Sequence, residues 1–152
     1  MAGTSHSASS LIGLDTNVLL RYFVAPGPVG SDQRQSSLAT ELMESGRPLR
    51  VCKTVILEME WVLRGVYGYA REEIGAVLSY LLDQPHIDVE DHRAVRQAAA
   101  NYAAGLDFAD ALHHASYAAC TQVVSFDDRS FARRSDELKL QPPLKLAGKS
   151  WR

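Results

Sequence analysis

A short apolar run meets a carboxylate in Leu11-Ile12-Gly13-Leu14-Asp15-Thr16-Asn17. Four mostly apolar residues followed by polar ones are typical of a buried strand, which here ends at Asp15. Thr16 then begins a helical stretch through Phe23, and the Pro- and Gly-rich segment 26–30 breaks the chain. The pattern predicts a strand that delivers an acidic side chain to the start of a helix.

The same alternation of short strands and amphipathic helices continues along the chain. We expect further strands at 49–52, 87–89 and 123–126, and an edge strand at 138–140. We expect helices at 31–45, capped by Ser31 or Asp32, at 54–63, capped by Thr54, and at 71–82, 91–104 and 107–119, followed by a short helical turn at 128–133. This order predicts an α/β fold with a mainly parallel sheet that helices cover on both faces.

Composition narrows the class of protein. The chain has 152 residues, of which 46% are hydrophobic and 22% charged, as expected of one globular domain. We expect a flexible leader at 1–10, a folded domain at 11–140 and a loose tail at 141–152. No apolar run approaches the roughly 20 residues of a membrane span. Cys52 and Cys120 form no metal motif and are expected to be reduced, mostly buried thiols, so we expect a cytoplasmic protein.

Two acids follow predicted strands. Asp15 ends the strand at 11–14 and Asp127 follows the strand at 123–126. Ligands of open parallel sheets bind at the carboxyl ends of the strands, although an Asp there is also a common turn former or helix cap. These two positions make Asp15 and Asp127 candidate site residues.

Two further acids lie on predicted helices. Glu58 has the apolar residues Val55, Trp61 and Val62 at i−3, i+3 and i+4 and no basic partner one turn away. Glu60, in contrast, has Arg64 at i+4, the favourable order for a surface ion pair. We therefore expect Glu58 to be the acid that needs a cation. Asp110 lies in the first turn of its helix, behind a predicted cap at Asp107.

Nearby polar residues have simpler explanations. His114 follows Asp110 at i+4 and is expected to be exposed or to support a ligand rather than to bind a metal itself. Asp128 is expected to cap the short helical turn.

If Asp15, Glu58, Asp110 and Asp127 converge, their mutual repulsion requires a cation. Carboxylate oxygens are hard ligands, which favours Mg²⁺ or Mn²⁺ over zinc. Such clusters activate water for attack on phosphodiesters. Candidate phosphate contacts are Arg21, Lys53, Arg64, Arg129, Arg133 and Arg134, each of which is also explained as a solvated surface charge.

Four segments together resemble the PIN-domain ribonucleases, and within them the VapC toxins of bacterial VapBC toxin–antitoxin pairs. They are Leu14-Asp15-Thr16-Asn17-Val18-Leu19-Leu20, Val55-Ile56-Leu57-Glu58, Asp107-Phe108-Ala109-Asp110-Ala111-Leu112, and Val124-Ser125-Phe126-Asp127-Asp128-Arg129-Ser130-Phe131. The resemblance spans about residues 11–140. It implies a three-layer α/β/α sandwich and a metal-dependent endoribonuclease that cleaves tRNA or mRNA.

By matching position, the resemblance gives Asp15, Glu58, Asp110 and Asp127 as the catalytic and metal-binding acids. Asn17 would orient the first acid, and Ser125 stands where the family commonly has a small hydroxyl residue. A homodimer or a hetero-oligomer with a VapB-like antitoxin is implied. The antitoxin would bind an apolar groove formed by Met59, Trp61, Tyr67 and Tyr69. Alternatively, these four residues belong to the hydrophobic core.

Two other classes of function stay open. One is a catalytically silent PIN-like domain that binds RNA or protein. The other is a phosphoacceptor α/β domain, although this chain lacks the activating Lys that such a domain needs after a late strand. The formal net charge of -2 excludes a basic coat protein, but removing four metal-bound acids leaves 16 − (18 − 4) = +2, which is compatible with a nuclease.

Overall fold

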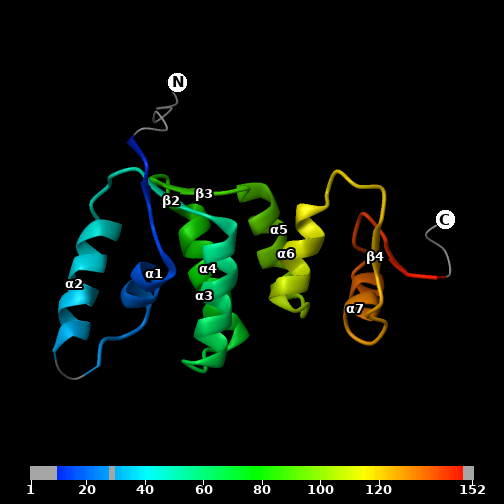
Figure 1. Ribbon diagram of the computed structural model, residues 1–152, viewed down its shortest axis with the longest axis horizontal. Helices are drawn as coiled ribbons and strands as arrows, with labels where there is room; N and C mark the ends of the chain where they lie inside the picture. Colours follow the sequence, from blue (N-terminus) through cyan, green and yellow to red (C-terminus); the bar gives the residue numbers. More distant parts are fainter. Residues whose placement is uncertain (1–9, 28–29, 149–152) are drawn as a thin grey trace. The chain divides into compact units, whose positions relative to one another are not determined.

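The computed structural model describes residues 10–27 and 30–148. The chain forms two compact units, one that ends at His92 and one that begins at Arg93 (Figure 1). In the described part of the chain, no helix combines the length and the apolar character needed to cross a membrane.

The first unit is built on a parallel sheet of three short strands, in the order β1-β2-β3. These are β1 (Ile12–Gly13), β2 (Leu49–Val51) and β3 (Ile87–Val89). Side chains alternate along β2 and β3. The apolar residues Leu49, Val51, Ile87 and Val89 are buried, whereas Arg50 and Asp88, which are register partners, are exposed and form an ion pair.

Four helices complete this unit. They are α1 (Thr16–Phe23), α2 (Ser31–Met43), α3 (Lys53–Gly65) and α4 (Arg71–Asp83). Helix α1 packs against α2 and α3, and Figure 1 shows α3 and α4 side by side next to β2 and β3. The core is aliphatic because α4 turns its buried stripe inward, with Ile74, Val77, Leu78, Leu81 and Leu82 all at most 9% exposed.

The parallel strands bring the residues that follow them to one edge of the sheet. Asp15 follows β1 and Lys53 follows β2. The backbone N–H of Lys53 donates to Glu90 Oε1 at 2.9 Å, and its Nζ forms an ion pair with Asp91 Oδ2 at 2.9 Å. This edge of the first unit is therefore strongly charged.

In its described residues, the second unit contains three helices and a two-stranded parallel sheet. Its elements are α5 (His92–Ala103), α6 (Phe108–Ser116), β4 (Val123–Ser125), α7 (Phe131–Glu137) and β5 (Leu144–Leu146). Tyr102 and Phe108 pack edge to face in the core, with ring centroids 5.4 Å apart. The crossover β4–α7–β5 makes the parallel pairing possible and gives the α/β character that the sequence predicts.

Most elements confirm the sequence prediction, and α1 matches the predicted 16–23 at both ends. Helix α6 ends at Ser116, earlier than predicted. The predicted side-chain caps of α2 and α3 are wrong: Gly30 and Cys52 occupy these N-cap positions, and neither provides a side-chain hydrogen bond. Ser31 is the first residue of α2, and Thr54 lies inside the first turn of α3.

The predicted edge strand at 138–140 is wrong. Leu138 follows α7 as its C-cap, and Lys139 has φ 52°, a left-handed conformation that ends the helix. The strand lies at Leu144–Leu146 instead, within the segment expected to be a loose tail. Residues 1–9 of the expected leader and residues 149–152 of the expected tail lie outside the described residues.

The prediction of mostly buried thiols is wrong for one of the two cysteines. Both are free thiols, but Cys120 is exposed and Cys52 is half-buried. Cys52 lies beside the hydroxyl of Thr54, with Sγ and Oγ1 3.2 Å apart.

Candidate active site

Asp15 lies where β1 ends and α1 begins. It is the N-cap of α1, and its Oδ1 accepts a hydrogen bond from the backbone N–H of Thr16 at 2.8 Å. The carboxylate stays exposed. Asn17, expected to orient Asp15, lies in the first turn of α1, but in the described part of the chain no hydrogen bond joins the two side chains. Asp15 is therefore held by the backbone of its own helix.

Helix α3 reverses the expected environments of its two acids. Glu60 is buried, with 2% exposure, and accepts a hydrogen bond from Arg64 Nε at 2.9 Å. The predicted Glu60–Arg64 pair is confirmed, but it is not a surface pair. Glu58 is exposed rather than buried in an apolar stripe. Glu58 thus remains a candidate ligand because its carboxylate is accessible, not because its burial demands a cation.

Asp110 lies in the first turn of α6, and Asp107 is its N-cap as predicted. Asp107 Oδ1 accepts a hydrogen bond from the backbone N–H of Asp110 at 3.2 Å. Burial raises the pKa of Asp110, and the negative charges of Asp107 and Asp127 raise it further. Asp110 is therefore a half-buried carboxylate that two neighbouring acids crowd.

Asp127 occupies the loop between β4 and α7 and is fully exposed. Its Oδ1 accepts from the backbone N–H groups of Arg129 and Ser130, each at 3.1 Å, and its Oδ2 accepts from Ser130 Oγ at 3.0 Å. The hydrogen bonds from Ser130 lower the pKa of Asp127, and the one from Arg129 adds to this. Ser125 Oγ accepts from the backbone N–H of Asp127 at 3.0 Å.

Two expectations about neighbouring residues are wrong. Asp127, not Asp128, makes the hydrogen bonds before α7, whose N-cap is Ser130. His114 is buried, with 2% exposure, and its Nε2 lies 2.7 Å from the carbonyl oxygen of Pro142. His114 is therefore not exposed, and it fixes the segment before β5.

The four predicted acids are divided between the two units. Asp15 and Glu58 belong to the first, and Asp110 and Asp127 to the second. Asp110 and Asp127 interact electrostatically. Within either unit, residues 10–27 and 30–148 contain no group of three or more His, Cys, Asp and Glu side chains that could hold a metal ion.

Five of the six predicted phosphate contacts have an acidic partner. Arg21 pairs with Asp32, Lys53 with Asp91, Arg64 with Glu60, and both Arg133 and Arg134 pair with Glu137. Arg129 is exposed, and its guanidinium has no partner among the residues that the structure describes. Arg129 is therefore the least committed of these cations.

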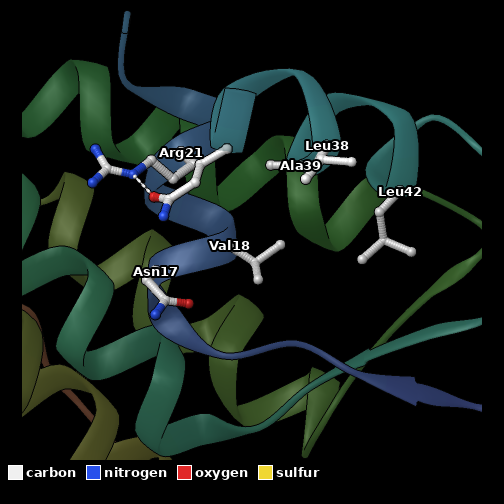
Figure 2. Close-up of a pocket in the computed structure, with 7 residues that line it drawn as sticks. Asn17, Val18, Arg21, Leu38, Ala39 and Leu42 are labelled. Atoms are coloured by element: carbon white, nitrogen blue, oxygen red, sulfur yellow. Dashed lines mark hydrogen bonds between the residues drawn. The ribbon is translucent and has the colours of Figure 1, made fainter. Parts of the chain in front are cut away.

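The expected apolar groove is only partly accessible. Trp61 and Tyr67 are 60% and 42% exposed, but Met59 is fully buried in the core. A different apolar hollow was missed by sequence reasoning. Figure 2 shows this pocket between α1 and α2, with Val18, Leu38 and Leu42 among its lining residues. The spacing of Leu38 and Leu42, one turn apart on a largely polar helix, was the available signal.

The sequence matches the PIN domain over residues 12–137, so the chain belongs to the PIN domain family. PIN domains have a nuclease-type fold, generally act as nucleases and typically use divalent metal ions. The α/β fold with parallel strands is consistent with their three-layer α/β/α arrangement. Neither the curated proteins nor the solved structures compared with the sequence include a significant match.

Proposed function

We propose that this protein is a metal-dependent endoribonuclease that hydrolyses RNA phosphodiester bonds. Its catalytic and metal-binding acids are Asp15, Glu58, Asp110 and Asp127, supported by Asn17 and Ser125. Membership of the PIN domain family supports a nuclease. To this we add the metal dependence, the RNA substrate and the roles of these residues.

The observation that carries this proposal is the crowding of Asp110. A half-buried carboxylate with two acidic neighbours is unfavourable when ionised, and its pKa is raised for this reason. A bound cation removes that cost. All four proposed ligands are carboxylates, and three of them are exposed or half-buried next to strand ends or helix starts, so the donor set fits Mg²⁺ or Mn²⁺.

The proposed site residues have different roles. A divalent cation, when bound, activates water and stabilises negative charge at the phosphate. Asp127 stays ionised because Ser130 and Arg129 donate hydrogen bonds to it. Asp15 stays at the start of α1 because Thr16 N–H fixes its Oδ1. The guanidinium of Arg129, which has no partner in the described part of the chain, can bind a phosphate oxygen of the RNA.

The test is cleavage of single-stranded RNA in the presence of Mg²⁺ or Mn²⁺, with EDTA and Asp15→Asn as the disabling changes. Asp136→Asn is the matched control, because Asp136 is exposed in α7 and its side chain has no partner in the described part of the chain. We expect EDTA and Asp15→Asn each to abolish cleavage and Asp136→Asn to retain it. Cleavage that survives both EDTA and Asp15→Asn contradicts the metal mechanism.

We further propose that this nuclease is the toxin of a bacterial type II toxin–antitoxin pair, acting on tRNA or mRNA in the cytoplasm. Its partner would be a VapB-like antitoxin, in a homodimer or hetero-oligomer, and residues 11–140 would form the nuclease domain. The resemblance of the four acidic segments to VapC toxins supports this role. Induced expression in bacteria should stop growth with the wild type but not with Asp15→Asn, and growth in both cases contradicts the role.

A further inference from the structure

The pocket between α1 and α2 lies within the first unit and has a volume of about 260 Å³. It is lined by Asn17, Val18, Arg21, Gln35, Leu38, Ala39 and Leu42. Ligand pockets for drug-sized molecules have roughly 300–1,000 Å³, so this pocket suits a single ring system rather than a larger molecule. It begins at the first turn of α1, two residues after Asp15.

Apolar side chains form the walls of the pocket. Figure 2 shows Leu38, Ala39 and Leu42 on α2 across from Val18 on α1. Leu38 is 56% exposed, which leaves a large aliphatic surface at the mouth of the pocket. Aliphatic side chains contact the faces of planar rings through van der Waals packing.

The polar end of the pocket has a fixed hydrogen-bonding pattern. Arg21 Nε donates to Gln35 Oε1 at 2.9 Å, the dashed line in Figure 2. Arg21 also pairs with Asp32 at 3.1 Å, which holds the guanidinium in place. An arginine can only donate, so this contact assigns the oxygen of the Gln35 amide and leaves its NH₂ group as the donor. Asn17, one turn before Arg21 on α1, adds a second exposed amide.

We propose that this pocket binds one unpaired nucleobase of the RNA substrate. The aliphatic walls contact the faces of the base, and the Gln35 NH₂ donates to a carbonyl oxygen or ring nitrogen at its edge. Proteins read single-stranded RNA in this way, through splayed bases that contact side chains and form hydrogen bonds along their edges. This inference rests on the proposed ribonuclease function and gives it a base-reading subsite.

Two features favour a base over an aliphatic side chain from a protein partner. An aliphatic side chain would leave the oriented Gln35 donor unused, whereas every base has an acceptor on its edge. Asp32 and Gln35 engage Nη2 and Nε of Arg21, and its Nη1, which has no partner among the described residues, can donate to a phosphate that accompanies a base. The pocket is lined by α1, and the N-cap of α1 is the proposed catalytic acid Asp15. The bound base would therefore contact the helix that begins at this acid.

The first arm of the test measures base preference. The wild type, Gln35→Ala and Leu38→Ala cleave a randomised single-stranded RNA pool with Mg²⁺ or Mn²⁺, and the cut sites are sequenced. Gln33→Ala is the matched control, because Gln33 lies on the same helix and does not line the pocket. We expect a base preference at one position near the cut, reduced about fivefold by Gln35→Ala, the factor of about one hydrogen bond. Gln33→Ala should keep the wild-type preference.

The second arm measures binding without cleavage. Nucleoside monophosphates are titrated into the ¹⁵N-labelled protein in EDTA, and the amide signals of Val18, Ala39 and Leu42 are followed by NMR. We expect these signals to move with nucleotides in the wild type and to move less in Gln35→Ala. N-acetyl-leucinamide serves as the probe for an aliphatic side chain and should leave the signals in place.

The outcomes separate the two proposals. If the wild type cleaves RNA without base preference, or if Gln35→Ala and Leu38→Ala keep its preference, the base pocket is wrong and the ribonuclease function stands. If the wild type cleaves no RNA, the ribonuclease function fails and the titration decides the pocket. Signals that respond only to N-acetyl-leucinamide, or to neither probe, overturn the base pocket.

Discussion

Replacement of Arg64 by Met should destabilise the protein because it strips a buried carboxylate of its partner. Glu60 has a side chain only 3% exposed, and Arg64 Nε lies 2.9 Å from its Oε1. Met retains most of the aliphatic stem of Arg64, so the change removes mainly the charged head. Glu60 then has to lose its negative charge or remain buried without this donor, and both cost free energy of folding.

The magnitude follows from the two exposures. Exposed ion pairs contribute about 0–1 kcal/mol, and breaking a fully buried pair costs about 3–5 kcal/mol. Arg64 is 49% exposed, so solvent screens half of this pair, and we expect a loss of about 2 kcal/mol. With a urea m-value of about 2 kcal/mol/M, the midpoint of unfolding should fall by about 1 M.

The assay is equilibrium unfolding in urea, followed by circular dichroism. Arg133→Met is the matched control, because Arg133 and Glu137 form an i,i+4 pair at 3.9 Å with 65% and 52% exposure. That control should change the free energy of unfolding by less than about 0.5 kcal/mol. Adding Glu60→Gln to Arg64→Met should restore part of the loss. Equal midpoints for Arg64→Met and Arg133→Met would refute the reasoning.

Three further substitutions test the core and the acids. Leu78→Ala truncates a side chain with 0% exposure and should lower the free energy of unfolding in urea by about 3 kcal/mol. Leu38→Ala, at 56% exposure, should lower it by less than about 1 kcal/mol. Similar losses for the two variants would contradict the assigned core. Glu58→Gln should lower the rate of RNA cleavage at least about tenfold without a change in the midpoint of unfolding. The control Glu41→Gln changes another exposed glutamate and should keep full activity. A fully active Glu58→Gln variant would remove Glu58 from the proposed site. In EDTA, Asp110→Asn should raise the free energy of unfolding at about pH 7, because the raised pKa of Asp110 means that its ionisation destabilises the folded protein as the pH rises through that pKa. At about pH 3 the carboxyl is protonated and the gain should vanish. A gain of equal size at about pH 3 would contradict the role of charge.

The two acids of α3 show what helical spacing can establish. The i+4 spacing of Glu60 and Arg64 correctly predicted their contact. Their burial was misjudged, although the chain held the signal. Val55, Ile56, Met59 and Leu63 form a buried stripe, and Glu60 lies inside it, one turn after Ile56. The positions of the apolar residues around an acid, rather than its charged neighbour alone, indicate its burial.

A repeated tripeptide marks the limit of local sequence patterns. Leu138-Lys139-Leu140 and Leu144-Lys145-Leu146 are identical, yet the first ends α7 and the second forms β5. The backbone N–H of Leu140 donates to the carbonyl of Ser135 at 3.0 Å, which closes the end of the helix. The second tripeptide pairs with β4 across a crossover. Alternating apolar residues permit a strand at either place, so the tripeptide pattern alone does not choose between them.

The two proposed site acids of the second unit, Asp110 and Asp127, have opposite electrostatic environments, and this difference suggests different roles. Asp127 receives hydrogen bonds that lower its pKa, so it remains ionised and its oxygens are already engaged by Ser130 and Arg129. Asp110 has a raised pKa, and the charge of Asp127 is one of its causes. An ionised Asp127 therefore makes Asp110 costly to ionise in the absence of a cation. We infer that Asp110 gains more than Asp127 from a bound metal ion, whereas Asp127 is already ionised before the ion binds.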